Sequence, residues 1–259
     1  MNVNYDCYQR PGVVEHYASK NKLQAPEAVI LSKYHHKIKN KAILDIGIGT
    51  GRTTNFLSPL SKNYIGIDYA PRMIEICKKN FPEANTMVCD VRSMPFEEEQ
   101  FDFILFSFNG IDHVEHHERI SILNNIRKLL KPDGIFCFST HNLDCNRNHP
   151  FSHHRFKLYK NPLKLISQNA KELPKFSYGF YNWMKNKKYE RYESEYAIIR
   201  DLGHDYGLVL YYISRESQLN QLTESLFSNI EVLALDGSYL KANDSSKDVW
   251  LYYVMGRKN

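Results

Sequence analysis

The sequence predicts a doubly wound α/β fold with a mostly parallel, seven-stranded sheet and an inserted cap. Between residues 41 and 142, short β-rich runs alternate with amphipathic segments, which is the pattern of parallel strands joined by crossover helices. The first run leads into a glycine-rich turn, and after Asn142 the alternation stops. We therefore expect four parts: N-terminal helices over a ligand site (1–40), the α/β core (41–142), an inserted cap (143–213), and a helix and strands that complete the sheet (214–259).

The core is expected to contain five strands and three helices. The strands are predicted at Ala42–Ile46, Tyr64–Ile67, Thr86–Cys89, Phe103–Ser107 and Ile135–Ser139. The helices are predicted at Arg52–Leu57, Arg72–Lys79 and Glu115–Leu130, the last of them ended by a turn at residues 131–134.

The flanking segments complete this outline. Two leading helices, Val13–Ser19 and Pro26–Lys33, are expected to pack over the sheet's edge and the ligand. The cap is expected to hold a helix at Asn161–Lys185, interrupted near Pro174, and strands at Tyr196–Arg200 and Leu208–Ile213. After it, Ser214 can cap a helix that runs through Leu226, and Ile230–Leu235 and Val249–Met255 supply two closing strands.

Composition and charge fit a folded domain and exclude several classes. Of the 259 residues, 42% are hydrophobic and 24% are charged, which excludes disordered and fibrous proteins. The formal net charge is +5, but the basic runs at 33–41 and 185–188 are short and separated by acidic residues. Such runs are typical of solvated faces, so nucleic acid is disfavoured as a partner.

The five cysteines and the lack of long apolar runs point to a cytoplasmic protein. The cysteines are scattered without a Cys-x-x-Cys pair, so neither a disulfide framework nor a cysteine-rich metal site is indicated. No stretch has the apolar length of a signal peptide or a membrane span.

The glycine-rich turn after the first strand carries the strongest chemical signal. Gly47, Gly49 and Gly51 let the backbone approach a ligand closely, and the next helix offers free N–H groups. A dinucleotide fingerprint needs Gly or Ala three positions after the second glycine, where this chain has Arg52. The spacing therefore disfavours a nicotinamide oxidoreductase.

With Asp45 two positions before Gly47, the turn reads Asp-x-Gly-x-Gly-x-Gly and resembles the signature of class I S-adenosylmethionine-dependent methyltransferases. Asp68 ends the second strand, Asp90 follows the third, and Leu129–Gly134 matches the family's turn into the fifth. The resemblance is close over residues 40–140. It implies a Rossmann-like methyltransferase fold and S-adenosyl-L-methionine as the cofactor.

The resemblance also implies roles for single residues. Asp68 would accept hydrogen bonds from both ribose hydroxyls, and Asp90 with the backbone of Val91 would hold the adenine. Tyr17 would lie against the methionine carboxylate, and the fourth strand would end beside the reaction centre. The full set expected at the cofactor is Tyr17, Asp45, Gly47, Gly49, Gly51, Asp68, Tyr69, Met73, Asp90, Val91, Phe106 and Ser107.

Two histidines are candidates for a catalytic base. His113 and His141 follow the fourth and fifth strands, at the sheet edge where α/β proteins bind ligands. An imidazole with an ordinary pKa near 6.5 can take a proton from a hydroxyl or an amine; a satisfied structural histidine is the alternative for both. His113, His116 and His117 lack the His-Glu-x-x-His order of a zinc helix, so no metal is expected.

The sequence thus predicts methyl transfer to an O or N atom of a small-molecule acceptor. The tyrosines of the cap would form either an aromatic wall for that acceptor or an ordinary core. An RNA methyltransferase and a non-catalytic, cofactor-binding partner subunit are the alternatives. The identity of the acceptor and the oligomeric state stay open, because the matching motifs belong to the cofactor site.

Overall fold

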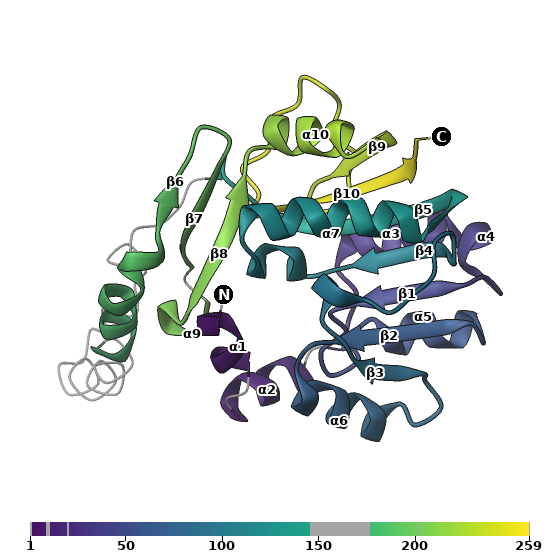
Figure 1. Ribbon diagram of the computed structural model, residues 1–259, viewed down its shortest axis with the longest axis horizontal. Helices are drawn as coiled ribbons and strands as arrows, with labels where there is room; N and C mark the ends of the chain where they lie inside the picture. The colour runs from purple at the N-terminus through teal and green to yellow at the C-terminus, as the bar shows by residue number, and fades with distance from the viewer. Residues whose placement is uncertain (1, 9–10, 20, 146–176, 202, 259) are drawn as a thin grey trace, which may run out of the picture.

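The computed structural model describes residues 2–8, 11–19, 21–145, 177–201 and 203–258. In this part of the chain, ten strands form one sheet in the order β3-β2-β1-β4-β5-β8-β7-β6, and β10 pairs with both β5 and β9. Figure 1 shows the sheet with helices on both faces. The predicted doubly wound, mostly parallel α/β fold is confirmed.

The parallel part of the sheet consists of five strands. These are β1 (Ile43–Ile46), β2 (Tyr64–Asp68), β3 (Thr86–Val88), β4 (Phe101–Phe106) and β5 (Leu130–Asn142). Two antiparallel strands, β9 (Phe227–Leu233) and β10 (Trp250–Arg257), continue the sheet beyond β5. Together they make the seven strands expected from the sequence. The expected turn at residues 131–134 lies within β5, where the register with β4 jumps from Phe101↔Leu130 to Phe103↔Ile135.

Three strands of the expected cap join this sheet. The sequence analysis predicted two of them as strands, but it did not predict that they extend the core sheet. They are β6 (Arg191–Tyr192), β7 (Tyr196–Asp201) and β8 (Leu208–Ile213). β8 pairs in parallel with the last residues of β5, as His141↔Tyr212 and Asn142↔Ile213. This is possible because β4 pairs with β5 only as far as Phe138, so the end of β5 offers free backbone groups.

Helices cover both faces of the sheet, and alternate residues of each strand face opposite cores. On one face, α7 (His116–Leu129) and α10 (Arg215–Glu224) pack with Leu44 and Ile104. On the other, α3 (Ala25–Lys33), α4 (His35–Ile38) and α5 (Thr54–Leu57) pack with Ile43 and Phe103. The remaining helical elements are α6 (Pro71–Asn80), η1 (Ser58–Leu60), η2 (Val91–Ser93), η3 (Gly110–His113), η5 (Lys187–Tyr189) and α9 (Gly203–Tyr206).

The N-terminal helices α1 (Asn2–Tyr8) and α2 (Pro11–Ala18) lie beside the cap strands. Cys7 and Val13 pack in one apolar cluster with Leu210 and Tyr212 of β8. α2 corresponds to the predicted helix at Val13–Ser19, whereas α1 was not predicted. Of the predicted cap helix, residues 161–176 lie outside the described residues, and residues 177–186 are helical.

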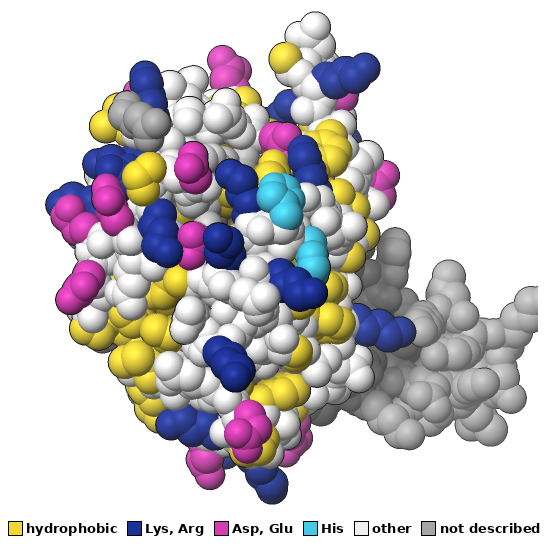
Figure 2. Space-filling model, turned by 90° about the vertical axis from the view of Figure 1, so that its right-hand side faces the viewer, with side chains coloured by type: hydrophobic (Ala, Val, Ile, Leu, Met, Phe, Trp, Pro, Cys, Tyr) yellow, Lys and Arg dark blue, Asp and Glu magenta, His cyan; other side chains and the backbone are white. Residues whose placement is uncertain are grey.

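Figure 2 shows the face at the amino ends of the parallel strands, where Lys and Arg side chains lie among Asp and Glu side chains. Four ion pairs join charges in this region: Lys33–Glu231, Lys128–Glu98, Lys131–Asp102 and Arg257–Glu99. Part of the positive charge in this region is therefore matched locally.

Candidate active site

A cavity of about 440 Å³ opens at the carboxyl ends of β1, β2, β3 and β4. Most of the residues expected at the cofactor line it: Tyr17, Gly47, Gly49, Asp68, Tyr69, Met73, Asp90, Val91, Phe106 and Ser107. The candidate base His113 lines it as well. Asp45, Gly51, His141 and the cap tyrosines expected near an acceptor do not.

Asp68 and Gly49 form the centre of the cavity wall. Gly49 has a positive φ of 56°, and a Cβ placed there would meet nothing within 4 Å, so its backbone faces open space. The N–H of Gly49 donates to Oδ2 of Asp68 at 2.8 Å, and the N–H of Ala70 donates to Oδ1 at 2.8 Å. Each carboxylate oxygen keeps a second lone pair, so this side chain can accept two further hydrogen bonds.

Burial raises the pKa of Asp68 to about 6, although the two backbone N–H groups oppose this shift. A pair of hydroxyls that donate to the carboxylate would replace lost hydration and favour its ionised form. The wall also holds the Tyr69 hydroxyl, which is buried and has no hydrogen-bond partner among the described residues. These unfilled hydrogen bonds fit a polar ligand such as a nucleoside.

Asp45 supports the glycine-rich turn from behind. It is fully buried, and its Oδ2 accepts from Thr53 Oγ1 at 2.7 Å and from the Tyr64 hydroxyl at 3.0 Å. Burial raises its pKa to about 7. The expectation that Asp45 faces the cofactor is corrected, because its side chain binds residues on α5's amino end and on β2 instead of lining the cavity.

Gly51 also acts through packing. Its φ is +102°, and a Cβ there would lie 2.4 Å from the Phe81 ring. The third glycine therefore lets the turn approach the end of α6, and its expected place at the cofactor is likewise corrected.

Asp90 lies at the other end of the cavity and is bound by Arg92. The Arg92 backbone N–H donates to Oδ1 at 2.9 Å, and Nη2 donates to Oδ2 at 2.6 Å. Arg92 also binds Glu118 of α7 at 2.8 Å. The hydrogen bonds from Arg92 hold the pKa of Asp90 below its usual value. The carboxylate is thus ionised and held in place, with limited capacity for a further donor.

A chain of three polar aromatic groups also lines the cavity. The Tyr8 hydroxyl lies 3.3 Å from the Tyr17 hydroxyl and 3.2 Å from Nε2 of His113. Nδ1 of His113 is buried without a partner in the described part of the chain. Burial lowers the pKa of His113 to about 4, so the imidazole is neutral at physiological pH and is a weak base.

Arg52, which the sequence analysis gave no role, lines the cavity and forms a buried ion pair with Glu27 of α3. Its Nη1 lies 2.5 Å from Oε2 and its Nη2 lies 2.8 Å from Oε1. Ser107 and Tyr252 also donate to Glu27. Burial opposes ionisation of Glu27, but the hydrogen bonds and charge of Arg52 hold its pKa below the usual value. This pair ties α3 to the glycine-rich turn and to the end of β4.

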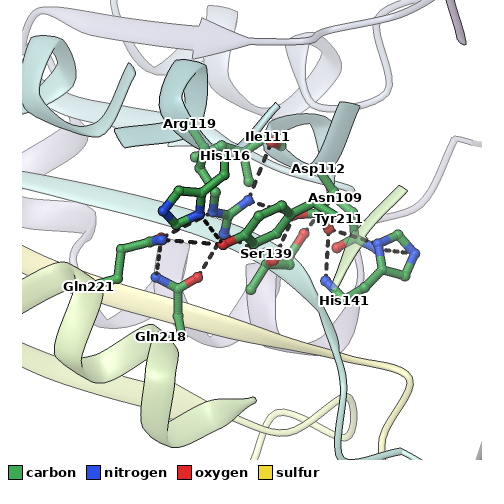
Figure 3. A network of polar contacts seen from close by, with 11 residues as sticks. Asn109, Ile111, Asp112, His116, Arg119, Ser139, His141, Tyr211, Gln218 and Gln221 are labelled. Atoms are coloured by element: carbon green, nitrogen blue, oxygen red, sulfur yellow. Dashed lines mark hydrogen bonds and ion pairs between the residues drawn. The ribbon is translucent and has the colours of Figure 1, made fainter. Parts of the chain in front are cut away.

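His141 lies in a separate, buried network, shown in Figure 3. Its Nδ1 is 2.7 Å from Oδ2 of Asp112, and its Nε2 is 3.3 Å from Nδ2 of Asn109. Arg119, which is fully buried, donates to Oδ1 of Asp112 at 2.7 Å and to Gln218 at 2.7 Å. Despite burial, His141 and Arg119 hold the pKa of Asp112 below its usual value.

The expectation that His141 borders the reaction centre is therefore corrected. The last residues of β5 are covered by β8, and the His141 ring packs 4.5 Å from the Tyr212 ring. Sequence alone placed His141 at the correct end of the sheet, but it could not show that another strand pairs there.

The chain is similar to known methyltransferases in sequence and in fold. Residues 43–134 match a family model described as a methyltransferase domain. An uncharacterized protein of Methanocaldococcus jannaschii is 28% identical over 151 residues, covering 54% of this chain and 56% of that protein. A ubiquinone biosynthesis O-methyltransferase of Actinobacillus pleuropneumoniae is 29% identical over 112 residues, covering 39% and 46%. The chain thus spans about half the length of these curated relatives.

Solved structures share the fold over nearly the whole chain. A TehB-like S-adenosylmethionine-dependent methyltransferase of Corynebacterium glutamicum has a TM-score of 0.57 at 17% identity and covers 96% of this chain and 100% of that one. The 1,6-didemethyltoxoflavin-N1-methyltransferase of Burkholderia thailandensis, solved with its namesake substrate and S-adenosylhomocysteine, has a TM-score of 0.55 at 14% identity and covers 99% and 90%.

The matched domain and the fold point the same way. Residues 43–134 match a methyltransferase domain, and the fold of the chain is similar to that of solved S-adenosylmethionine-dependent methyltransferases. These matches support S-adenosylmethionine as the cofactor.

Proposed function

We propose that this chain transfers the methyl group of S-adenosylmethionine to an O or N atom of a small-molecule acceptor. The observation that carries the proposal is the Asp68–Gly49 pair, whose free lone pairs and open backbone face the cavity at the carboxyl ends of the strands. This is the edge at which α/β folds bind their ligands.

The residues around the cavity favour one orientation of the bound cofactor. Asp68 would accept from the ribose hydroxyls, and the adenine would lie toward Asp90 and Val91. The methionine end would lie toward Gly47 and Tyr17. When bound, the cofactor supplies a methyl group activated by a positively charged sulfur.

The protein's contribution to transfer would be alignment and exclusion of water. Tyr8, Tyr17 and Phe108 are aromatic and line the cavity with His113. Such walls orient an acceptor and strengthen electrostatic interactions by removing solvent. His113 would use Nδ1 as a hydrogen-bond partner for the acceptor. Because the low pKa of His113 makes it a weak base, it suits an acceptor that needs no strong base. Such an acceptor is a neutral amine, or an acidic hydroxyl that loses its proton easily.

A small acceptor is favoured over RNA by the position of charge and of the N-terminal helices. An RNA enzyme needs a basic groove that leads to its pocket. Here the basic residues at 33–41 belong to α3, α4 and the loop before β1, at the other end of the strands, while Tyr8 and Tyr17 of α1 and α2 form the cavity wall. The toxoflavin-type enzyme among the structural neighbours acts on a small molecule by its name. The cytoplasmic location that we inferred from the cysteine pattern stays a prediction.

Calorimetry and an acceptor screen would test the proposal. We expect the purified chain to bind S-adenosylmethionine and S-adenosylhomocysteine and to ignore NAD. With a panel of small amines and phenols, release of S-adenosylhomocysteine should depend on the added acceptor. Binding of NAD in preference would overturn the cofactor assignment. If the chain binds the cofactor and methylates RNA but no small acceptor, the RNA methyltransferase alternative is favoured. If activity appears only when a partner subunit is added, the cofactor-binding partner subunit is favoured.

A further inference from the structure

The short helix η3 carries two neighbouring residues with different surroundings. His113 lines the cavity, whereas Asp112 is fully buried and belongs to the polar network of Figure 3. A single 3₁₀ turn has little stability of its own, so its place is set by contacts with other elements. The contacts that hold η3 therefore decide where the His113 ring lies in the cavity.

Asp112 anchors η3 to β5 and α7 through both of its carboxylate oxygens. Oδ1 accepts from Nη1 of Arg119 at 2.7 Å and from the Thr140 hydroxyl at 2.6 Å. Oδ2 accepts from the backbone N–H of His141 at 2.8 Å, and Nδ1 of the same residue lies 2.7 Å away. A carboxylate offers about four acceptor sites, so Asp112 is saturated. Hydrogen bonds to an ionised carboxylate are also stronger than neutral ones.

Arg119 extends this anchor to the backbone of η3. Its Nη1 also donates to the Ile111 carbonyl at 3.3 Å. Its Nη2 donates to Thr140 at 3.1 Å and to Gln218 of α10 at 2.7 Å. Within the described part of the chain, Gln218 makes no hydrogen bond to Asp112. Thr140 thus contacts the anchor directly, and Gln218 contacts it only through Arg119.

The His113 side chain has few contacts that could fix its place. Its Nε2 lies 3.2 Å from the Tyr8 hydroxyl, and its Nδ1 has no hydrogen-bond partner among the described residues. The two rings meet edge to face, with their centres 5.2 Å apart. The position of the imidazole therefore depends mainly on the backbone of η3, which Asp112 holds.

We propose that Asp112 is a positioning residue for methyl transfer, because it holds the His113 ring at the part of the cavity next to Tyr8. The proposal rests on the proposed function, in which Nδ1 of His113 binds the acceptor. Transfer depends steeply on alignment, and a misplacement of about 1 Å can slow a reaction about 100-fold. The Gly49–Asp68 hydrogen bond belongs to other elements, so the effect should not reach the ribose end of the cofactor site.

Nuclear Overhauser effects between the rings of His113 and Tyr8 measure this placement in the full chain without any acceptor. Asp112→Asn removes the charge of the anchor, and Thr140→Val removes one of its hydrogen bonds. We expect both variants to weaken the effect between the two rings and to shift the ¹⁵N signals of His113. Unchanged His113 signals in a folded Asp112→Asn variant would overturn the proposal.

Gln218→Leu is the matched control. Thr140 and Gln218 are both buried and both accept from Nη2 of Arg119, but of the two only Thr140 donates to Asp112. Gln218→Leu should therefore lower stability in urea denaturation, as Thr140→Val does, yet keep the His113 signals of the wild type. Equal changes at His113 in both variants would overturn the proposal. This pair decides the question if Asp112→Asn does not fold.

Turnover and cofactor binding separate this proposal from the proposed function. With an acceptor found in the screen, Asp112→Asn should lower kcat by about 100-fold, and Thr140→Val should lower it less. Changed His113 signals with wild-type turnover would overturn the role in transfer. So would a loss of S-adenosylhomocysteine affinity in a folded variant. A wild-type chain that methylates no acceptor would contradict the proposed function alone, and the spectra would still decide whether Asp112 places His113.

Discussion

The backbone N–H of Gly49 donates a 2.8 Å hydrogen bond to Oδ2 of Asp68, so the glycine-rich turn and the end of β2 hold one carboxylate between them. The Ala70 N–H binds the other oxygen, which leaves both oxygens free for one more donor each. Replacing Asp68 with Ala should weaken S-adenosylmethionine binding by about 1–3 kcal/mol, because two ribose hydroxyls lose a charged acceptor. Calorimetry measures this directly.

Asp90→Ala is the matched comparison for that experiment. Because Arg92 binds the Asp90 carboxylate through its backbone and its guanidinium, we expect a smaller loss of cofactor affinity than for Asp68→Ala. Equal losses at the two positions would contradict the assignment of Asp68 as the main acceptor.

Cofactor affinity should rise with pH between about 5 and 7. Burial raises the pKa of Asp68 to about 6, so the free protein holds a proton there at pH 5 and must release it to accept from both hydroxyls. The same shift means that Asp68 favours the folded state most at low pH, and that this contribution is lost as pH rises through its folded pKa. Calorimetry across this range measures the rise, and Asp68→Asn should flatten it. An unchanged pH profile in the variant would assign the dependence to another group.

His113 should remain neutral down to about pH 4. Its pKa is lowered by burial, because protonation would place a charge in a poorly solvated position. Two-dimensional NMR of protein labelled with ¹⁵N-histidine would follow its ring nitrogens, and His113→Gln would assign the signals. Titration near pH 6.5 would instead restore His113 as an ordinary general base.

Glu27→Gln should destabilise the fold by about 3–5 kcal/mol, because it leaves the buried Arg52 charge without its partner. The double variant Glu27→Gln/Arg52→Gln should recover part of this loss. Urea denaturation measures both. Lys33→Gln, which breaks an ion pair between half-exposed side chains, should cost no more than about 1 kcal/mol. If Glu27→Gln and Lys33→Gln lower the free energy of unfolding equally, the buried pair is not needed for stability.

Asp112→Asn should affect stability and leave the cofactor site intact. The carboxylate is fully buried between Arg119 and His141, so the variant should lose about 3–5 kcal/mol in urea denaturation. Since the folded pKa of Asp112 is lowered, its stabilising contribution is present above the unfolded pKa and is lost as pH falls through the folded one. Affinity for S-adenosylhomocysteine should stay near the wild-type value. A large loss of affinity in a folded variant would link this network to the cavity.

The sequence was sufficient to predict the parallel core and most of the residues that line the cavity, because these depend on local patterns. The spacing of Gly47, Gly49 and Asp68 follows from one strand, one turn and the next strand. Contacts between distant segments could not be read in this way. Glu27 meets Arg52 only once α3 packs on the sheet, and Tyr8 meets His113 across 105 residues. His141 was misplaced for the same reason, since its burial depends on the pairing of β8 with β5.

The contact between Asn4 and Val209 gives α1 a protective role. The Asn4 amide accepts from the Val209 N–H at 3.0 Å and donates to its carbonyl at 2.8 Å, as a neighbouring strand would. A single side chain thus closes part of an edge where β8 extends beyond β5. Exposed strand edges are templates for pairing between molecules. Chains that lack α1, or that carry Asn4→Ala, should therefore form aggregates more readily on storage, even where the cofactor cavity is intact.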